Sequence, residues 1–284
     1  MDDATFVILG ANGQLGTALR AQYPNARALD SSQLDITDAD AITGFDWSTV
    51  STILNAAAYT NVDGAETAEG RAAAWQVNAV GARNLAAAAA VHDICLVHIS
   101  SDYVFDGSHE NHAETESFTP LSVYGQTKAA ADLAVSLVPK HYILRTTWVI
   151  GDGKNFVRTM IGLGQKGISP TVVSDQVGRL TFTDELVRSI DHLLSTTAPY
   201  STYNATNDGT PASWADITRE IFTEGGFDLT VTDATTAEYF LGKADIAPRP
   251  LNSVMDLRKL QATGFNSTDW HTELKDYIQK ELAQ

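Results

Sequence analysis

Thr5-Phe6-Val7-Ile8-Leu9 is followed directly by Gly10-Ala11-Asn12-Gly13-Gln14-Leu15-Gly16. The first run is apolar and rich in β-favouring residues, which predicts a strand buried on both faces. Residues 17–20 then continue in a helical pattern, so the three glycines fall between a strand and a helix. Such a turn brings bare backbone N–H groups and a helix N-terminus against a pyrophosphate. The stretch therefore predicts dinucleotide binding rather than a merely structural turn.

Further strands are predicted at 26–29, 51–54, 93–99 and 139–145, with helical segments between them, the longest at 63–90. This alternation predicts an α/β fold with a doubly wound, Rossmann-type parallel sheet and helices on both faces. After residue 148 the regularity fades. We therefore predict a dinucleotide-binding domain over 1–148. Residues 149–284 are predicted to form mainly a smaller substrate-binding lobe, with some segments returning to the first domain.

The second predicted strand ends in Asp30, at the distance from the glycines where an acid accepts hydrogen bonds from the adenosine ribose. An acid there repels a 2′-phosphate, which favours NADH over NADPH, although Arg27 lies close by and a turn role for Asp30 is the alternative. Small residues after the third strand leave room for a coenzyme. The predicted coenzyme contacts are Gly10, Asn12, Gly13, Gln14, Leu15, Gly16, Asp30, Asp35, Ile36, Ala56, Ala57, Ala58, Tyr124 and Lys128.

Tyr124 and Lys128 are four residues apart, so on a helix they lie on one face. A lysine ammonium beside a phenol favours the phenolate, so we expect the pKa of Tyr124 to fall below its ordinary value of about 10. Ser101 follows the fourth strand at its carboxyl end, where doubly wound sheets place their chemistry. The alternative is a surface helix with a packed tyrosine and a solvated lysine. Convergence with the glycine turn favours a catalytic group of Ser101, Tyr124 and Lys128.

The net charge of -16 argues against nucleic acid or an anionic membrane as a partner. Cys95 is the single cysteine, which excludes an internal disulfide and fits a reducing compartment. With no apolar run of membrane-spanning length and no basic leader, we expect a cytoplasmic location. The loop 106–123 contains His109, His112, Glu114 and Glu116, but their spacing favours a solvent-facing lid over a metal site.

Several further motifs follow one another along nearly the whole chain. They are Gly10–Gly16, Asn55–Thr60, Val62-Asp63, Ser101–Gly107, Tyr124–Lys128, Leu144–Val149, Asn155-Phe156, Asp175-Gln176 and Arg249–Ser253. In these motifs and their order the chain resembles the dTDP-4-dehydrorhamnose reductase family of the extended short-chain dehydrogenase/reductase superfamily. Several spaced motifs are far more specific than any one of them.

The resemblance implies an NADPH- or NADH-dependent oxidoreductase that reduces the 4-keto group of dTDP-4-dehydro-L-rhamnose. It implies that Tyr124 protonates the new alkoxide, that Lys128 tunes Tyr124 and holds the nicotinamide ribose, and that Ser101 bonds the carbonyl. Coenzyme preference varies within the family, so Asp30 does not decide it. The substrate contacts implied by the resemblance are Thr60, Val62, Ser101, Asp102, Tyr103 and Trp148 for the sugar, and Asn155, Gln176 and Arg249 for the diphosphate.

Two departures from the family pattern concern other parts of the chain. Ala18 stands where members that dimerise around a metal carry an acid, so we expect no metal and a monomer or an unbridged homodimer. Leu180 replaces a frequent proline. Three alternatives stay open: a related dTDP-sugar ketoreductase, an epimerase or dehydratase, and a non-catalytic regulatory subunit of the same fold. A dehydratase is disfavoured because Tyr103 stands where that enzyme carries a glutamate.

Overall fold

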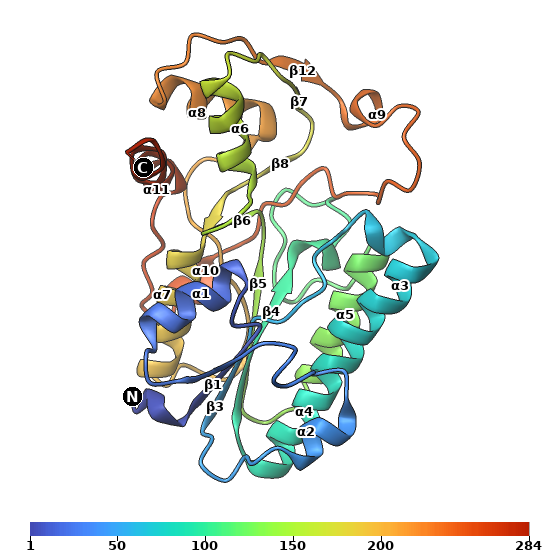
Figure 1. Ribbon diagram of the computed structural model, residues 1–284, viewed down its shortest axis with the longest axis vertical. Helices are drawn as coiled ribbons and strands as arrows, with labels where there is room; N and C mark the ends of the chain where they lie inside the picture. The colour runs from blue at the N-terminus through green and yellow to red at the C-terminus, as the bar shows by residue number, and fades with distance from the viewer. Residues whose placement is uncertain (284) are drawn as a thin grey trace.

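A computed structural model, which describes residues 1–283, contains a six-stranded parallel sheet below a smaller lobe (Figure 1). The sheet has the order β10-β5-β4-β3-β1-β2, and every neighbouring pair is parallel. The predicted doubly wound Rossmann-type fold is confirmed. The strands are β1 (Phe6–Leu9), β2 (Arg27–Leu29), β3 (Thr52–Asn55), β4 (Cys95–Ser101), β5 (His141–Thr146) and β10 (Ser201–Asn204).

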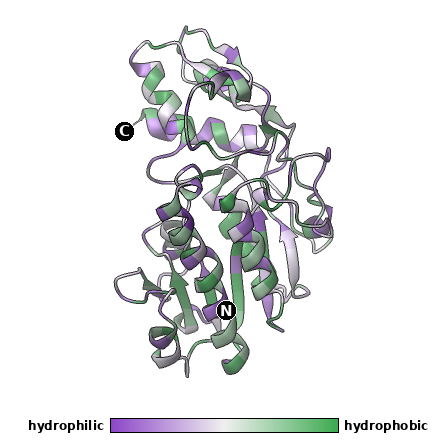
Figure 2. Cartoon of the chain, turned by 90° about the vertical axis from the view of Figure 1, so that its right-hand side faces the viewer, coloured by the Kyte–Doolittle hydropathy of each residue, from purple (hydrophilic) through white to green (hydrophobic). Residues whose placement is uncertain are grey.

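Helices cover both faces of the sheet because its strands are apolar on both sides. In β1, Phe6 and Ile8 join one core cluster, whereas Val7 and Leu9 join the other. The first cluster lies under α1 (Gln14–Gln22), α7 (Thr183–Ser195) and α10 (Arg258–Gln261). The second lies under α2 (Ala39–Gly44), α4 (Ala82–His92) and α5 (Val123–Val135). Figure 2 shows the apolar strands between these helices; each buried large side chain contributes roughly 1.5–3 kcal/mol.

The strand order reverses beside β1, which has β2 on one side and β3 on the other. At such a switch point the loops leave in opposite directions and open a crevice at the carboxyl ends of the strands. Gly10 follows β1 with φ +75°, and a Cβ there would approach the backbone N of Ala57 to 2.6 Å. Glycine is therefore required at position 10 by both conformation and space.

The segment 63–90, predicted as one helix, is broken into several pieces. It comprises a 3₁₀ turn Gly64–Glu66, α3 (Ala68–Ala74), a π-helical turn Trp75–Gly81 and most of α4. Asparagine within a helix is usually an exposed polar residue, but the π-turn buries Asn78. Its side chain accepts a bond from Tyr59 N at 2.8 Å and donates to the Thr127 hydroxyl at 3.0 Å. Asn78 thus ties the loop after β3 to α5.

The lobe packs α6 (Phe156–Gln165), α8 (Trp214–Glu224) and α11 (Trp270–Leu282) around a core that includes the fully buried Trp270. A capping box of Ser213 and Asp216 starts α8. Three short pairs of strands accompany these helices: β6 (Val149–Ile150) with β9 (Thr181–Phe182), β7 (Thr171–Val173) with β12 (Thr232–Ala234), and β8 (Val177–Gly178) with β11 (Ala212–Ser213). The short helix α9 (Thr236–Tyr239) follows β12.

Parts of the chain beyond residue 148 also pack in the sheet body. β10 pairs with β5, and Leu186 and Ile190 of α7 lie in the core beneath α1. The boundary at residue 148 stays a prediction. In the described range 1–283, no helix combines the length and apolar character needed to cross a membrane.

The loop 106–123, predicted as a solvent-facing lid, is exposed only in part. His112 is fully buried, its Nδ1 lies 2.9 Å from Glu116, and its backbone N donates to Val254 O. Glu114 accepts a bond from Asn204 N at 2.9 Å. These contacts anchor the loop to β10 and to the segment after the lobe, and His109 remains the exposed histidine. Within residues 1–283, no three His, Cys, Asp or Glu side chains gather as metal ligands would.

Candidate active site

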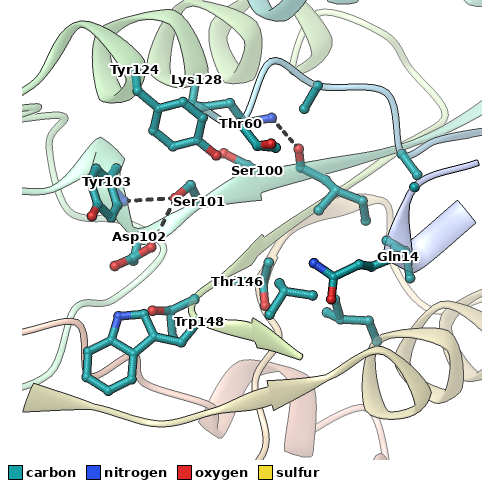
Figure 3. A pocket seen from close by; sticks show the side chains of 18 of the residues that line it. Gln14, Thr60, Ser100, Ser101, Asp102, Tyr103, Tyr124, Lys128, Thr146 and Trp148 are labelled. Atoms are coloured by element: carbon teal, nitrogen blue, oxygen red, sulfur yellow. Dashed lines mark hydrogen bonds between the residues drawn. The ribbon is translucent and has the colours of Figure 1, made fainter. Parts of the chain in front are cut away.

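A cavity of about 490 Å³ opens at the carboxyl ends of β1, β3, β4 and β5 (Figure 3). It contains the three side chains predicted as the catalytic group, Ser101, Tyr124 and Lys128. The other lining residues are Gly13, Gln14, Leu15, Ala56, Ala57, Ala58, Thr60, Val62, Ile99, Ser100, Asp102, Tyr103, Thr146, Thr147, Trp148, Val149 and Leu186. The cavity thus joins the glycine turn to the polar ends of the central strands.

Ser101 ends β4 in extended conformation, and its hydroxyl is oriented by its two neighbours. It accepts a bond from Tyr103 N at 3.2 Å and donates to Asp102 Oδ1 at 3.0 Å. Tyr124 and Lys128 come from the first turns of α5, which Ser122 caps by accepting a bond from Gly125 N. Figure 3 shows the Tyr124 hydroxyl pointing into the cavity beside the serines.

Helix α5 is held close to the end of β4 by contacts that tolerate little change. A Cβ on Gly125 would lie 2.2 Å from Tyr103 O, so a larger residue would push the helix away. The Tyr103 and Tyr124 rings meet edge to face at 5.5 Å. Glu66 accepts a bond from Val123 N at 2.9 Å, which satisfies one of the free donors at the helix start.

Burial dominates the electrostatics of the catalytic group. It raises the pKa of Tyr124 to about 12, an effect that the Ser101 hydroxyl partly offsets. It also lowers the pKa of Lys128 to about 8, which the Asp132 carboxylate partly counters. The expected fall in the pKa of Tyr124 is wrong for this structure. The Lys128 ammonium donates to Ile99 O at 2.6 Å, and burial rather than this charge decides the direction in which the pKa of Tyr124 shifts.

Asp102 is the acidic group nearest to Ser101. It is buried, and burial raises its pKa to about 6 in spite of hydrogen bonds from hydroxyl groups, including that of Ser101. Its Oδ2 atom is buried without a hydrogen-bond partner. Such an oxygen at a cavity wall is suited to accept a bond from a ligand hydroxyl, or to donate one when protonated.

A second cavity, of about 500 Å³, continues along the sheet edge from the first and shares Gly13 and Ala56–Ala58 with it. The remaining lining residues are Gly10, Asn12, Asp30, Ser31, Ser32, Leu34, Asp35, Ile36, Thr37, Tyr59 and Val77. The two cavities form one crevice across the switch point, the place where this class of sheet binds dinucleotides.

The residues of this crevice fit a dinucleotide. A Cβ on Gly16 would lie 2.1 Å from Gly10 O, so the helix α1 packs directly under the glycine turn and presents its N-terminus. Asp30 accepts bonds from Asn12 Nδ2 at 2.8 Å and from the Ser32 hydroxyl at 2.6 Å, and such bonds lower its pKa. Asp30 is therefore an anion at neutral pH, on the wall of the second cavity.

Comparison with known proteins agrees with this geometry. The family described as "RmlD substrate binding domain" matches residues 4–283. The dTDP-4-dehydrorhamnose reductase of Aggregatibacter actinomycetemcomitans is 38% identical over 96% of this chain and 98% of that protein. The chain belongs to the dTDP-4-dehydrorhamnose reductase family. The predicted family and the predicted class, an NAD(P)H-dependent oxidoreductase, are confirmed.

Two solved structures of reductases from this family are closely similar. The one from Clostridium acetobutylicum superposes with a TM-score of 0.89 at 38% identity, covering 98% of this chain and 99% of that one. The one from Bacillus anthracis, solved in complex with NADP, gives a TM-score of 0.88 at 34% identity, with 97% and 98% covered. The predicted type of coenzyme, NADPH or NADH, is confirmed at the level of the family.

Most of the residues that we predicted to contact coenzyme or substrate line the crevice. Thr60, Val62, Asp102, Tyr103 and Trp148 line the first cavity with the catalytic group, as do Gln14 and Leu15. The second cavity contains the predicted Gly10, Asn12, Gly13, Asp30, Asp35, Ile36, Ala56, Ala57 and Ala58. Gly16 lies beneath the turn and lines neither cavity.

The three residues predicted for the diphosphate line neither cavity and have protein partners. Asn155 caps α6 and donates to Gly151 O at 2.7 Å. Gln176 donates to the Thr236 hydroxyl at 3.0 Å. Arg249 forms an ion pair with Asp63 at 2.8 Å, which joins the lobe to the segment after β3.

Some cavity residues were not predicted. Thr146 and Thr147 follow β5 and line the first cavity, and the rule that identified Ser101 at the end of β4 could have identified them as well. The segment Ser31-Ser32 and Tyr59 line the second cavity. Val77 also reaches it, from the π-helical turn, and no local sequence signal marks that turn.

Proposed function

We propose that this chain reduces the 4-keto group of dTDP-4-dehydro-L-rhamnose to give dTDP-L-rhamnose, with NADPH or NADH as reductant. The observation that supports this most directly is the convergence of Ser101, Tyr124 and Lys128 on a cavity continuous with the glycine-turn crevice. Ketone reduction needs a hydride on one side of the carbonyl carbon and a proton at its oxygen. The crevice would hold the coenzyme that supplies the hydride, and the hydroxyl groups of Ser101 and Tyr124 would supply the hydrogen bond and the proton.

The coenzyme is held, in this proposal, by the residues of the crevice. Backbone N–H groups of the turn from Gly10 to Gly16 receive the pyrophosphate, and Asp30 receives the ribose next to adenine. Ala56–Ala58 leave space beside β3 for the rest of the molecule. When bound, the coenzyme supplies the hydride.

The remaining chemistry belongs to side chains of the first cavity. The Ser101 hydroxyl turns its one proton from Asp102 to the ketone oxygen, and Tyr124 transfers its phenolic proton to that oxygen as it becomes an alkoxide. A raised pKa keeps Tyr124 protonated and ready to donate at neutral pH. The Lys128 ammonium stabilises the phenolate that remains, so the C–O product is a neutral alcohol and the negative charge stays on Tyr124 until solvent reprotonates it.

The sugar nucleotide is placed by the walls of the cavity. Thr60, Val62, Tyr103 and Trp148 surround the deoxyhexose, and Asp102 bonds one of its hydroxyl groups. Arg249 serves the diphosphate after exchanging Asp63 for phosphate oxygens, a geometry for which a guanidinium is suited. Asn155 and Gln176 support this side from their positions in the lobe.

The test is direct assay of the purified protein with dTDP-4-dehydrorhamnose and each coenzyme. We expect consumption of coenzyme absorbance and one dTDP-rhamnose formed for each coenzyme oxidised. Reduction of another dTDP-4-keto sugar at equal or higher kcat/KM would favour a related ketoreductase. Similar sugars must be compared directly, because one methyl or hydroxyl group changes kcat/KM only modestly. Epimerised or dehydrated product with no net coenzyme oxidation would favour the other reaction classes. Coenzyme binding without turnover, together with a stable complex with a second enzyme, would favour a regulatory subunit.

A further inference from the structure

Trp148 has an unusual backbone conformation for a large residue. Its φ is +47°, in the left-handed region that side chains with a Cβ adopt at a cost. The residue joins β5 to β6, and its carbonyl accepts a bond from Thr181 N at 3.2 Å. Such a conformation persists only where the surroundings hold it in place.

The surroundings that hold Trp148 come mainly from the lobe. The Trp214 indole stacks on the Trp148 indole with ring centres 3.8 Å apart and an angle of 23° between the planes. Phe156 supports Trp214 from α6, with ring centres 4.4 Å apart. Trp214 is itself fixed as the first residue of α8 by the capping box at Ser213.

Other contacts limit the space around the Trp148 ring. A Cβ placed on Gly178 would approach this ring to 3.1 Å, so β8 passes directly against it. Trp148 lines the cavity that contains Ser101 and Tyr124, whereas Trp214 does not line it. Figure 3 shows the Trp148 indole forming the part of the wall below Asp102. Trp214 therefore reaches the cavity only through the indole on which it stacks.

We propose that Trp214 is a positioning residue, which holds the Trp148 indole as a fixed apolar wall for the ring and methyl group of a 6-deoxyhexose. The inference rests on the proposed function for the identity of the sugar, but not for the position of the indole. A flat aromatic wall contacts the C–H face of a pyranose and the methyl group of a deoxy sugar, and it offers nothing to an additional hydroxyl. Fixing the wall before binding removes an ordering cost that the substrate would otherwise bear.

The experiment compares Trp214→Leu with Trp214→Phe and with Phe222→Leu. The last variant removes a ring from the same helix and the same lobe core, away from Trp148. The chain has five tryptophans, so the ¹⁹F NMR spectrum of protein labelled with 5-fluorotryptophan contains only a few signals. The signal that is missing from a Trp148→Phe sample is that of Trp148. We expect Trp214→Leu to shift and broaden the Trp148 signal without any ligand. Trp214→Phe and Phe222→Leu are expected to leave it sharp.

Kinetics then test the effect on the substrate. We expect Trp214→Leu to raise KM for the sugar nucleotide about tenfold, which is about 1.4 kcal/mol, with kcat within about threefold of wild type. Its Kd for the coenzyme is expected to stay unchanged, and Trp214→Phe to restore most of the affinity. An unshifted Trp148 signal in Trp214→Leu overturns the inference, as does an equal rise of KM in Phe222→Leu.

Failure of the proposed function is a separate result. If the wild-type protein oxidises no coenzyme with the keto sugar, the reductase proposal is lost. The ¹⁹F signal of Trp148 still supports or overturns the positioning by Trp214, because it is recorded on the protein alone.

Discussion

The cavity wall that carries Ser101, Tyr124 and Lys128 is built from β4 and α5, which are neighbours in both sequence and space. The wall at Trp148 depends instead on contacts with segments near residues 178, 181 and 214, which are distant from it in the chain. The first wall holds buried charges with displaced pKa values, and the second is aromatic. A regular sheet can thus position polar groups by its own geometry, whereas the wall at Trp148 depends on contacts from the lobe.

The ion pairs on the two sides differ in the same way. Near α5, Asp132 and Arg145 are both buried and lie 2.9 Å apart, where loss of one partner would leave an unpaired charge. Between the lobe and the segment after β3, Arg249 and Asp63 are partly open to solvent, where an ion pair typically contributes little to stability. We therefore expect changes on the sheet side to affect turnover and changes on the lobe side to affect substrate affinity.

The sharpest test of this division is Tyr124→Phe, for which we expect the largest effect. Loss of the proton donor should lower kcat by about a thousandfold, within the range typical of general acids. Coenzyme affinity should be nearly unchanged, as measured by fluorescence titration. Tyr203→Phe is the matched control, because its hydroxyl donates to Pro199 O away from the cavity. Equal losses in both variants would contradict a catalytic role for Tyr124.

Lys128→Met tests the buried charge on the same wall. We expect kcat to fall by about a hundredfold, since the phenolate of Tyr124 loses its cation. The pKa of Lys128 falls from 10.5 in the unfolded chain to about 8 in the folded protein. The buried ammonium therefore destabilises the folded state, and this cost is fully present below pH 8. That cost disappears as pH rises through the unfolded value.

The stability of Lys128→Met should therefore exceed that of wild type at pH 7 by about 1–2 kcal/mol, after subtracting the lost bond to Ile99 O. The gain should shrink as pH rises from 8 toward 10.5 and reach zero within that range, as measured by thermal unfolding across pH. Wild-type turnover should decline above pH 8 as Lys128 loses its proton. A variant that is less stable than wild type at pH 7 would show that the ammonium is well paired rather than costly.

These same regions show how far sequence reasoning reaches. Five of the six strands of the sheet, and the placement of Ser101 at the end of β4, follow from apolar runs and the strand-end rule. β10 was not predicted, because Ser201–Asn204 is short and mostly polar and lies at the sheet edge. Its partner β5 is far away in the chain, and pairing at that separation leaves no local pattern.

The properties that depend on burial could not be predicted from the sequence either. The spacing of Tyr124 and Lys128 correctly places both on one cavity, but it cannot show that desolvation raises the pKa of the phenol. Asn78 looks like any polar residue in a helix until the π-helical turn aims it inward. The lobe residue Trp214 carries no motif that connects it with Trp148, since the two meet only in the folded chain.

On the lobe side, Arg249→Gln should raise KM for the sugar nucleotide about thirtyfold and change kcat little, because it removes a cation from the diphosphate. Arg219→Gln is the matched control, an arginine of α8 that pairs with Asp216 and Asp233. A fall in kcat with unchanged KM would contradict the division between the two walls.

The smallest effect on kinetics is expected at Asp30, which follows the edge strand β2. Asp30→Ala should raise the ratio of kcat/KM for NADPH over NADH about tenfold, since it removes an anion that repels a 2′-phosphate. Asp46→Ala offers a close control, because Asp46 accepts a bond from the Ser48 hydroxyl as Asp30 does from Ser32, but lies at the exposed surface outside the cavity. Loss of Asp46 should leave the ratio unchanged and thereby account for any general effect of losing a surface carboxylate. If Asp30→Ala weakens both coenzymes equally, Asp30 orders the turn through Asn12 and Ser32 rather than choosing between the ribose groups.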